Sequence, residues 1–352
     1  MTAKSSHGNF FEDFRLGQTI AHASPRTLTQ GDRALYTALY GPRFALQSSD
    51  AFARTLGHPQ SPLDNLLVFH TIFGKSVPDI SRNAIANLGY AEGRFLKPVY
   101  PGTSLSARSE VIGLKENSSR ETGIVYVRTE GLDETGATVL SYVRWVMVRK
   151  RNPTAKVSDM HVPELAGAVS ASQFRIPSHI RFEGYDAAAA GSPLLWDDYE
   201  PDEKIDHVDG VTVEEADHMM AARLYQNTAG VHFNQFSEQG SRFGRRLVYG
   251  GHVISLARAL SFNGLANAIS LLGINGGRHA HPLFAGDTVF AWSQVLDKAE
   301  IAGRPDCGAL RLRLVATRNL PCDGFPDRNE GGEYPDAIVL DFDYWALMPR
   351  RS

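Results

Sequence analysis

Cysteine is scarce in this sequence, which has only two among 352 residues, Cys307 and Cys322. Two cysteines cannot supply the disulfide framework of a small secreted domain, so we expect a reducing compartment. No apolar run approaches the roughly 18 residues that a membrane span needs. The first residues also lack the apolar stretch of a secretory signal. These absences predict a cytoplasmic protein that does not enter a membrane.

An excess of charge of either sign is lacking too, since 36 Lys and Arg stand against 39 Asp and Glu, a net charge of −3 at pH 7. A protein that holds a phosphate backbone needs a basic surface, so nucleic acid is not expected as a partner. Hydrophobic residues make up 43% of the chain and aromatic residues 10%, which is enough for a folded core and excludes a disordered chain. The length suggests two domains.

The chain repeats itself in its two halves. Residues 84–98 align with residues 268–282 at an offset of 184, and seven of the fifteen pairs are identical. Upstream, residues 27–32 match residues 212–217 at an offset of 185, and each segment opens an apolar-periodic helix. These matches have the same order in both halves, which indicates a duplicated domain.

A third match, of residues 142–145 with residues 342–345, has an offset of 200 and requires an insertion in the second half. We place it in the Gly-, Pro- and Asp-rich stretch 321–335. The stretch after Pro153 has no counterpart and is expected to be a loop-rich connector. The predicted domains are therefore an N-terminal half (1–153), a connector (154–199) and a C-terminal half (200–352).

Both halves have the same predicted elements. A helix at residues 66–73 is matched by one at residues 252–260. Alternating strands follow each helix, at residues 103–112, 123–129, 139–148, 288–296, 309–317 and 337–347. This order predicts an α+β fold in which each sheet curls against one buried helix and the two sheets join edge to edge. The glycines at 273–277 have a twin at 89–93, so we expect a turn of the repeat there and not a dinucleotide-binding loop.

The second half carries a motif that resembles that of the MaoC-like, (R)-specific enoyl-CoA hydratases. His232 follows Asn227 by five residues, and Gly250 follows His232 by eighteen. The run from Arg94 to Gly102, RFLKPVYPG, is similar to another segment of that family. The resemblance implies a tandem hot-dog fold, with two antiparallel sheets each wrapped on a long helix. It also implies reversible hydration of a short, branched, dicarboxylic enoyl-CoA thioester such as mesaconyl-CoA, with no metal or redox cofactor.

The first half lacks the motif. Gln47 stands at the position of His232, and Asn65 stands at the position of Gly250. Pro42 stands at the position of the family's catalytic acid. We therefore expect one active site per chain, in the second half, with the first half shaping the substrate tunnel.

The residue types suit the hydration of a thioester. An imidazole such as that of His232 can exchange protons near neutral pH, and the N–H of Gly250 at a helix start can stabilise a developing oxyanion. Asn227 occupies the position of the family's catalytic Asp, and an amide cannot act as a base but can hold a water. Either His232 acts as acid and base with Asn227 orienting the water, which we favour, or a carboxylate such as Asp217 or Glu238 takes over.

Other residues are expected to contact the substrate: Asn65, Arg94, Phe95, Leu96, Lys97, Asn234 and Gly251. The backbone of residues 94–97 could bind a pantetheine arm, and Arg94 or Lys97 could bind a phosphate or carboxylate. His279 and His281 have the spacing of metal ligands, but no third ligand is evident and no metal site is expected. An acyl-CoA thioesterase and a non-catalytic acyl-CoA-binding subunit stay open as alternative functions, and a homodimer is a further expectation.

Overall fold

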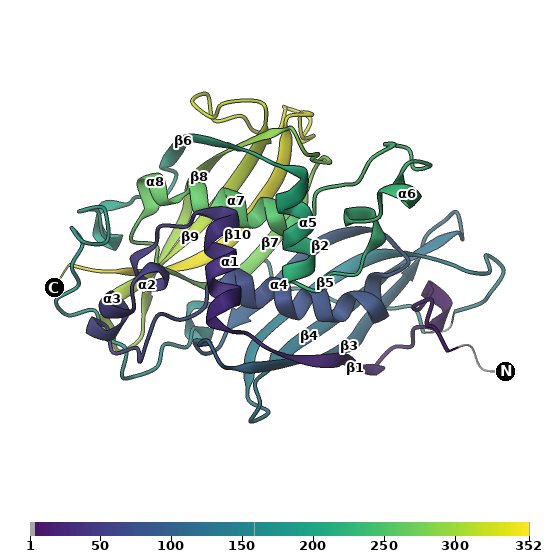
Figure 1. Ribbon diagram of the computed structural model, residues 1–352, viewed down its shortest axis with the longest axis horizontal. Helices are drawn as coiled ribbons and strands as arrows, with labels where there is room; N and C mark the ends of the chain where they lie inside the picture. The colour runs from purple at the N-terminus through teal and green to yellow at the C-terminus, as the bar shows by residue number, and fades with distance from the viewer. Residues whose placement is uncertain (1–3, 158, 352) are drawn as a thin grey trace.

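The computed structural model describes residues 4–157 and 159–351, which form one ten-stranded antiparallel sheet with helices across one face (Figure 1). The strand order is β1-β3-β4-β5-β2-β7-β10-β9-β8-β6. The first-half strands are β1 (Thr19–Thr27), β2 (Ala84–Phe95), β3 (Ser104–Glu116), β4 (Thr122–Leu132) and β5 (Thr138–Arg149). The second-half strands are β6 (Lys204–Thr212), β7 (Ser270–His279), β8 (Thr288–Ile301), β9 (Arg304–Arg318) and β10 (Ile338–Pro349). The expected antiparallel α+β fold is thus present as one continuous sheet, whose two five-stranded halves meet at β2 and β7.

Two buried helices lie against this sheet, one from each half: α4 (Asn65–Ser76) and α7 (Gly250–Leu260). Their apolar side chains belong to one hydrophobic core that spans both halves, which confirms the predicted helices. The remaining helices are α1 (Gln30–Tyr40), α2 (Ala45–Ser48), α3 (Asp50–Thr55), α5 (Glu215–Leu224), α6 (Gln235–Glu238) and α8 (Phe262–Leu265). Figure 1 shows α1 and α5 in front of α4 and α7, where α1 contacts both α5 and α7. Within the described ranges, none of the helices combines the length and hydropathy that a membrane span needs.

Strand pairing repeats in the two halves. Gly89 of β2 lies opposite Trp145 of β5, and Gly273 of β7 lies opposite Trp345 of β10. The offsets of 184 and 200 between these pairs are those of the sequence alignment. The duplication predicted from the sequence is therefore present in the register of the sheet.

The glycine clusters at 89–93 and 273–277 lie inside β2 and β7, so the predicted turn is wrong. These strands need glycine because neighbouring side chains cross them. A Cβ atom on Gly89 would lie 2.8 Å from Cη2 of Trp145, and one on Gly277 would lie 2.7 Å from Cδ2 of Tyr90. Both distances are shorter than atomic contacts allow, so the glycines mark close packing within the sheet.

In its described residues, the connector between the halves consists of loops and two short 3-10 helices, η3 (Ala171–Gln173) and η4 (Trp196–Asp198). It is nevertheless well packed, because Phe174, Ile180 and Phe182 join a hydrophobic cluster with Trp345 of β10. It thus covers the second half of the sheet. The two halves share one sheet, so the domain boundaries at 153 and 199 stay predictions.

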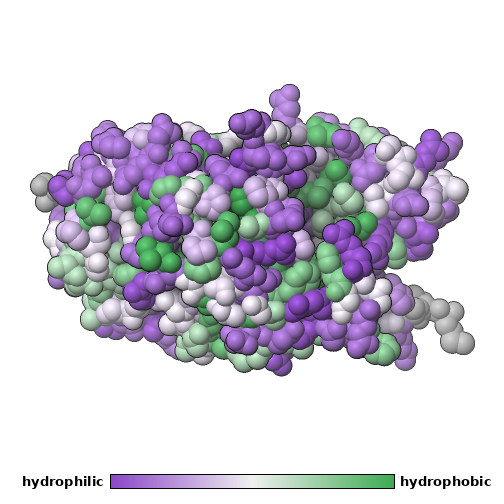
Figure 2. Space-filling model, turned by 90° about the horizontal axis from the view of Figure 1, so that it is seen from above, coloured by the Kyte–Doolittle hydropathy of each residue, from purple (hydrophilic) through white to green (hydrophobic). Residues whose placement is uncertain are grey.

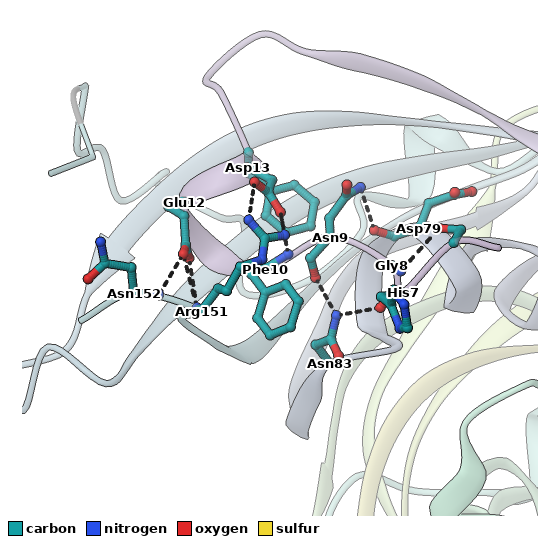
Figure 3. A network of polar contacts seen from close by, with 12 residues as sticks. His7, Gly8, Asn9, Phe10, Glu12, Asp13, Asp79, Asn83, Arg151 and Asn152 are labelled. Atoms are coloured by element: carbon teal, nitrogen blue, oxygen red, sulfur yellow. Dashed lines mark hydrogen bonds and ion pairs between the residues drawn. The ribbon is translucent and has the colours of Figure 1, made fainter. Parts of the chain in front are cut away.

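Hydrogen bonds hold the N-terminal segment against Asn83, just before β2, and against the residues just after β5 (Figure 3). The amide of Asn83 donates to the backbone carbonyls of His7 and Asn9, at 2.9 and 3.1 Å. The carboxylate of Glu12 accepts from the backbone N–H groups of Arg151 and Asn152, just after β5. Behind this network a second cluster, which includes Phe11 and Phe14, covers the first half of the sheet.

Candidate active site

His232 ends a short 3-10 helix, η5 (Gly230–His232), in the loop between α5 and α7. Its Nδ1 lies 3.0 Å from the carbonyl oxygen of Leu247. A carbonyl only accepts, so Nδ1 carries the proton and Nε2 keeps its lone pair. Burial lowers the pKa of His232 to about 4, so the ring is neutral at pH 7. Among the described residues no hydrogen bond uses Nε2, which leaves an oriented base.

The start of α7 offers free hydrogen-bond donors. No side chain caps this helix, and within the described part of the chain nothing accepts the N–H of Gly250 or Gly251. The first half differs, since the carboxylate of Asp64 caps α4 and accepts from Leu66 N–H at 2.8 Å. Free N–H groups at a helix start carry partial positive charge and attract a negative oxygen. The second N–H of α4 is therefore occupied, whereas at the start of α7 the first two N–H groups both stay open among the described residues.

Aromatic rings from both halves surround this helix start. The ring of His232 lies edge-on to Tyr249, with centroids 5.4 Å apart. A Cβ on Gly250 would lie 2.6 and 2.7 Å from Nε2 and Nδ1 of His279. A Cβ on Gly251 would lie 2.6 Å from Cε1 of His70, which comes from α4. A Cβ at either position would therefore force these rings to move, and the site is built by both halves. From above, Figure 2 shows a face that is hollowed, with hydrophobic residues gathered in the hollow.

Sequence reasoning missed His279 as a candidate for this site. Its Nε2 lies 3.3 Å from the hydroxyl of Tyr90 on β2. Burial and the nearby His232 lower the pKa of His279 to about 4. The signal was present in the repeat, where Phe95 occupies the equivalent position. Of the two halves, only the one that carries the motif thus has a histidine at this position of the repeat.

Asn227 is buried close to this loop. Its Oδ1 accepts the N–H of Ala229 at 3.0 Å, which holds the turn that leads to His232. None of the described hydrogen bonds uses its Nδ2. Asn234, in contrast, is exposed and caps α6 by accepting from Ser237 N–H at 3.2 Å. A substrate contact of Asn234 stays a prediction.

An open pocket, whose space of about 570 Å³ includes open solvent, lies where the first half meets the connector, β7 and β10. Gln47, Asn65, Phe95 and Lys97 line it together with the connector and β7. The Oδ1 of Asn65 is occupied, because it accepts from the Ser270 hydroxyl at 2.8 Å. Gln47 and Asn65, the first-half counterparts of His232 and Gly250, thus line this pocket together.

The predicted contacts of residues 94–97 with the substrate stay predictions. The Nζ of Lys97 pairs with the carboxylate of Asp133, and the Leu96 N–H donates to the carbonyl of Val139. The Nε of Arg94 is buried without a partner among the described residues. Nowhere in residues 4–157 and 159–351 do three His, Cys, Asp or Glu side chains gather in a group that could hold a metal ion.

The comparisons with known proteins agree with one another. The profile of the mesaconyl-CoA hydratase family matches residues 2–321. A β-methylmalyl-CoA dehydratase of Chloroflexus aurantiacus is 61% identical, and the match covers all of both chains. A mesaconyl-CoA hydratase of Cereibacter sphaeroides is 61% identical over 99% of this chain and 100% of its own.

Solved structures show the same fold. A MaoC domain protein dehydratase from Chloroflexus aurantiacus superimposes with a TM-score of 0.97 at 61% identity, over 100% of both chains. A Mycobacterium tuberculosis protein with a double hotdog fold superimposes with a TM-score of 0.74 at 26% identity, over 97% of this chain and 99% of its own.

Proposed function

This chain belongs to the mesaconyl-CoA hydratase family, and on that premise we propose that it catalyses the reversible addition of water to mesaconyl-CoA, which gives β-methylmalyl-CoA. The observation that carries the proposal is the fixed tautomer of His232 in the loop that leads to the uncapped start of α7. His232 supplies a base, and the free N–H groups at the start of α7 supply oxyanion donors. The reaction is a hydro-lyase reaction, and coenzyme A enters it only as part of the substrate.

The thioester carbonyl is proposed to accept a hydrogen bond from Gly250 N–H. This interaction withdraws electrons from the double bond and makes the β-carbon electrophilic. The water oxygen then bonds to the β-carbon while Nε2 of His232 takes one water proton. The electron pair of the double bond moves toward the thioester oxygen. An oxyanion donor of this kind contributes about 10²–10³ in rate, and the acid–base group about 10²–10⁴.

His232 then completes the addition. It returns its proton to the α-carbon, the carbonyl re-forms, and the imidazole is neutral again. Because burial lowers the pKa of His232 to about 4, its imidazolium form is more acidic than an ordinary one and gives the proton up readily. The same steps in reverse dehydrate β-methylmalyl-CoA.

Asn227 is proposed to orient the attacking water. Its Oδ1 already accepts from Ala229 N–H and has one lone pair left, while its Nδ2 can donate to the water oxygen. Asn227→Asp and Asn227→Ala test this role by their hydration rates. If the alanine variant keeps full turnover, Asn227 does not take part. Binding of the CoA arm by residues 94–97, a homodimer and a cytoplasmic location stay predictions.

One experiment separates the proposed activity from the alternatives. The protein is incubated with mesaconyl-CoA, and loss of the conjugated thioester absorbance is followed beside release of free CoA thiol. We expect a product heavier by one water, no thiol release, and loss of activity in His232→Gln. Thiol release indicates a thioesterase, and binding without turnover indicates a non-catalytic subunit. Either result overturns the proposal.

A further inference from the structure

We propose that Arg144 binds the free carboxylate of the substrate, with the amide of Asn87 beside it, and so selects a dicarboxylic acyl group. This inference rests on the proposed function and deepens it, because it names the residues that recognise the acyl group. It starts from two side chains, one on β5 and one on β2, whose hydrogen-bonding capacity the described residues leave partly or wholly unused. Neither belongs to the motif of His232 and Gly250.

Arg144 is a fully buried cation, with a relative exposure of 0%. Its guanidinium donates to the hydroxyl of Ser76 at 2.8 Å but reaches that of Ser81 only at 3.4 Å. Its Nε has no hydrogen-bond partner among the described residues. The guanidinium also packs on the ring of Phe73, 4.2 Å from the ring centroid. A guanidinium stays charged in proteins, and a buried charge without a counter-ion is costly.

The buried arginine of α7, Arg258, is in a different position. Burial raises the pKa of Asp64, and the charge of Arg258 opposes that rise, so Arg258 has an acidic group nearby. Burial lowers the pKa of Arg144, and the groups that oppose this effect are all tyrosines. Tyrosine hydroxyls are neutral at pH 7. Among the described residues, Arg144 therefore lacks the acidic partner that Arg258 has.

The surroundings of Arg144 lead to the start of α7. The ring of Phe73, on which the guanidinium packs, has its centroid 5.8 Å from that of Tyr249, the residue before Gly250. Burial raises the pKa of Tyr249, and the charge of Arg144 is among the effects that oppose this rise. The acyl chain of the substrate is short. A thioester oxygen held at Gly250 therefore brings the free carboxylate into this region.

The repeat places Asn87 at the wall of the same site. Leu271 lines the open pocket together with the first-half counterparts of the motif residues. Leu271 pairs with Ala346 on β10, and Asn87 pairs with Val146 on β5. The offsets of 184 and 200 are those of the repeat, so Asn87 is the equivalent of Leu271. We therefore place Asn87 beside the motif as Leu271 lies beside its counterparts.

The amide of Asn87 is unused. Its Oδ1 and its Nδ2 are both buried, and neither has a hydrogen-bond partner within the described part of the chain. Val146, which lies opposite Asn87, is two residues from Arg144 on β5, so Asn87 and Arg144 share one face of the sheet. Their equivalents in the repeat are Leu271 and Tyr344, neither of which is a cation. A cation beside an amide thus occurs in one copy of the repeat alone.

A carboxylate matches these two groups. A guanidinium can donate parallel hydrogen bonds to both oxygens of a carboxylate, and the Nδ2 of Asn87 can donate to one of them. The guanidinium is buried before the substrate arrives, so the cost of removing it from water is met on folding and not on binding. In such surroundings an ion pair is stronger than in water. The pair forms with a dicarboxylic substrate and not with one that has an apolar end.

A neutral analogue tests the proposal on the wild-type protein. In this thioester a methyl group replaces the free carboxylate of mesaconyl-CoA, so its binding leaves Arg144 without a counter-ion. We expect its kcat/KM for hydration to be about 10³-fold lower than that of mesaconyl-CoA, or lower still, because a site with buried polar groups rejects an analogue that cannot pair with them. Equal values for the two thioesters overturn the inference.

Arg144→Met removes the charge and keeps a side chain that can fill the space. We expect the kcat/KM for mesaconyl-CoA to fall about 10²–10³-fold, while that for the neutral analogue rises or stays within about threefold. Asn87→Leu, which installs the residue of the other copy, changes the ratio of the two values in the same direction by about tenfold. Arg128→Met is the matched control and keeps the wild-type ratio, because Arg128 on β4 pairs with the carboxylate of Glu92 at 2.7 Å.

The ratio is a readout that a purely structural role would not move. If Arg144→Met lowers both values alike, the inference is overturned. If this variant does not fold, the comparison of the two thioesters on the wild-type protein decides. The proposed function fails separately, when the wild-type protein hydrates neither thioester. Calorimetric binding of mesaconyl-CoA and of the neutral analogue to the wild-type protein then tests the inference, and equal affinities overturn it.

Discussion

A methyl group at Gly250 would test the geometry of the site with the smallest possible change. In Gly250→Ala the new Cβ would lie 2.6 Å from Nε2 of His279, whereas ordinary contacts begin at 3.4 Å. Cε1 of the ring is nearer still, so the ring must retreat by about 1 Å, and a displacement of that size costs about 10²-fold in rate. Because a side chain and not the backbone gives way, the free energy of unfolding falls by only about 1–3 kcal/mol.

The assay is hydration of mesaconyl-CoA with purified Gly250→Ala, beside thermal unfolding. Gly276→Ala is the matched control, because a Cβ there meets nothing within 4 Å. We expect a kcat about 10²-fold lower for Gly250→Ala and wild-type rates for Gly276→Ala. A Gly250→Ala variant with wild-type kcat would refute the reasoning, since the helix start would then tolerate a side chain despite the contact with His279.

Three further predictions follow from the same contacts. The kcat/KM falls at acid pH with an apparent pKa near 4, because His232 must be neutral to act, and a pH–rate profile measures this. The free energy of unfolding falls as pH falls from about 6.5 toward 4, because His232 binds a proton in the unfolded chain but not in the folded one, and pH-dependent unfolding measures this. Gly74→Ala places a Cβ against the backbone carbonyl oxygen of Tyr225 and 2.9 Å from its carbonyl carbon. Because backbone must move, the free energy of unfolding falls by about 3 kcal/mol or more in denaturant titration, and kcat falls as well because that loop leads to His232. Asp64→Ala removes the cap of α4 and lowers the free energy of unfolding by about 1 kcal/mol. The kcat is kept, because this cap lies in the half without the motif. An unchanged free energy of unfolding would contradict the capping role.

Much of the fold could be predicted from the repeat, because duplicated residues carry duplicated registers. Gly89 pairs with Trp145 and Gly273 with Trp345, so the sheet pairs the residues that the sequence alignment makes equivalent. The apolar runs of α4 and α7 also predicted helices, since both are buried between the sheet and the surrounding elements. β1 was not predicted, because Pro25 interrupts its alternation.

The features that were not predicted depend on contacts between residues far apart in the sequence, which a sequence pattern does not contain. The glycines of β2 and β7 looked like a turn because the rings that cover them come from other strands, as Trp145 covers Gly89. His279 was considered only as a metal ligand, although its partners are Gly250 and Tyr90 from separate elements. The motif could place His232, but the packing around it became visible only in three dimensions.

The central claim is tested most directly by mass spectrometry of mesaconyl-CoA incubated with the wild-type protein and with His232→Gln. The account predicts that the wild type equilibrates the thioester with a product one water heavier, from either direction. It predicts that the variant does so about 10²–10⁴-fold more slowly while it still binds the thioester. Equal rates for the two proteins would contradict the account.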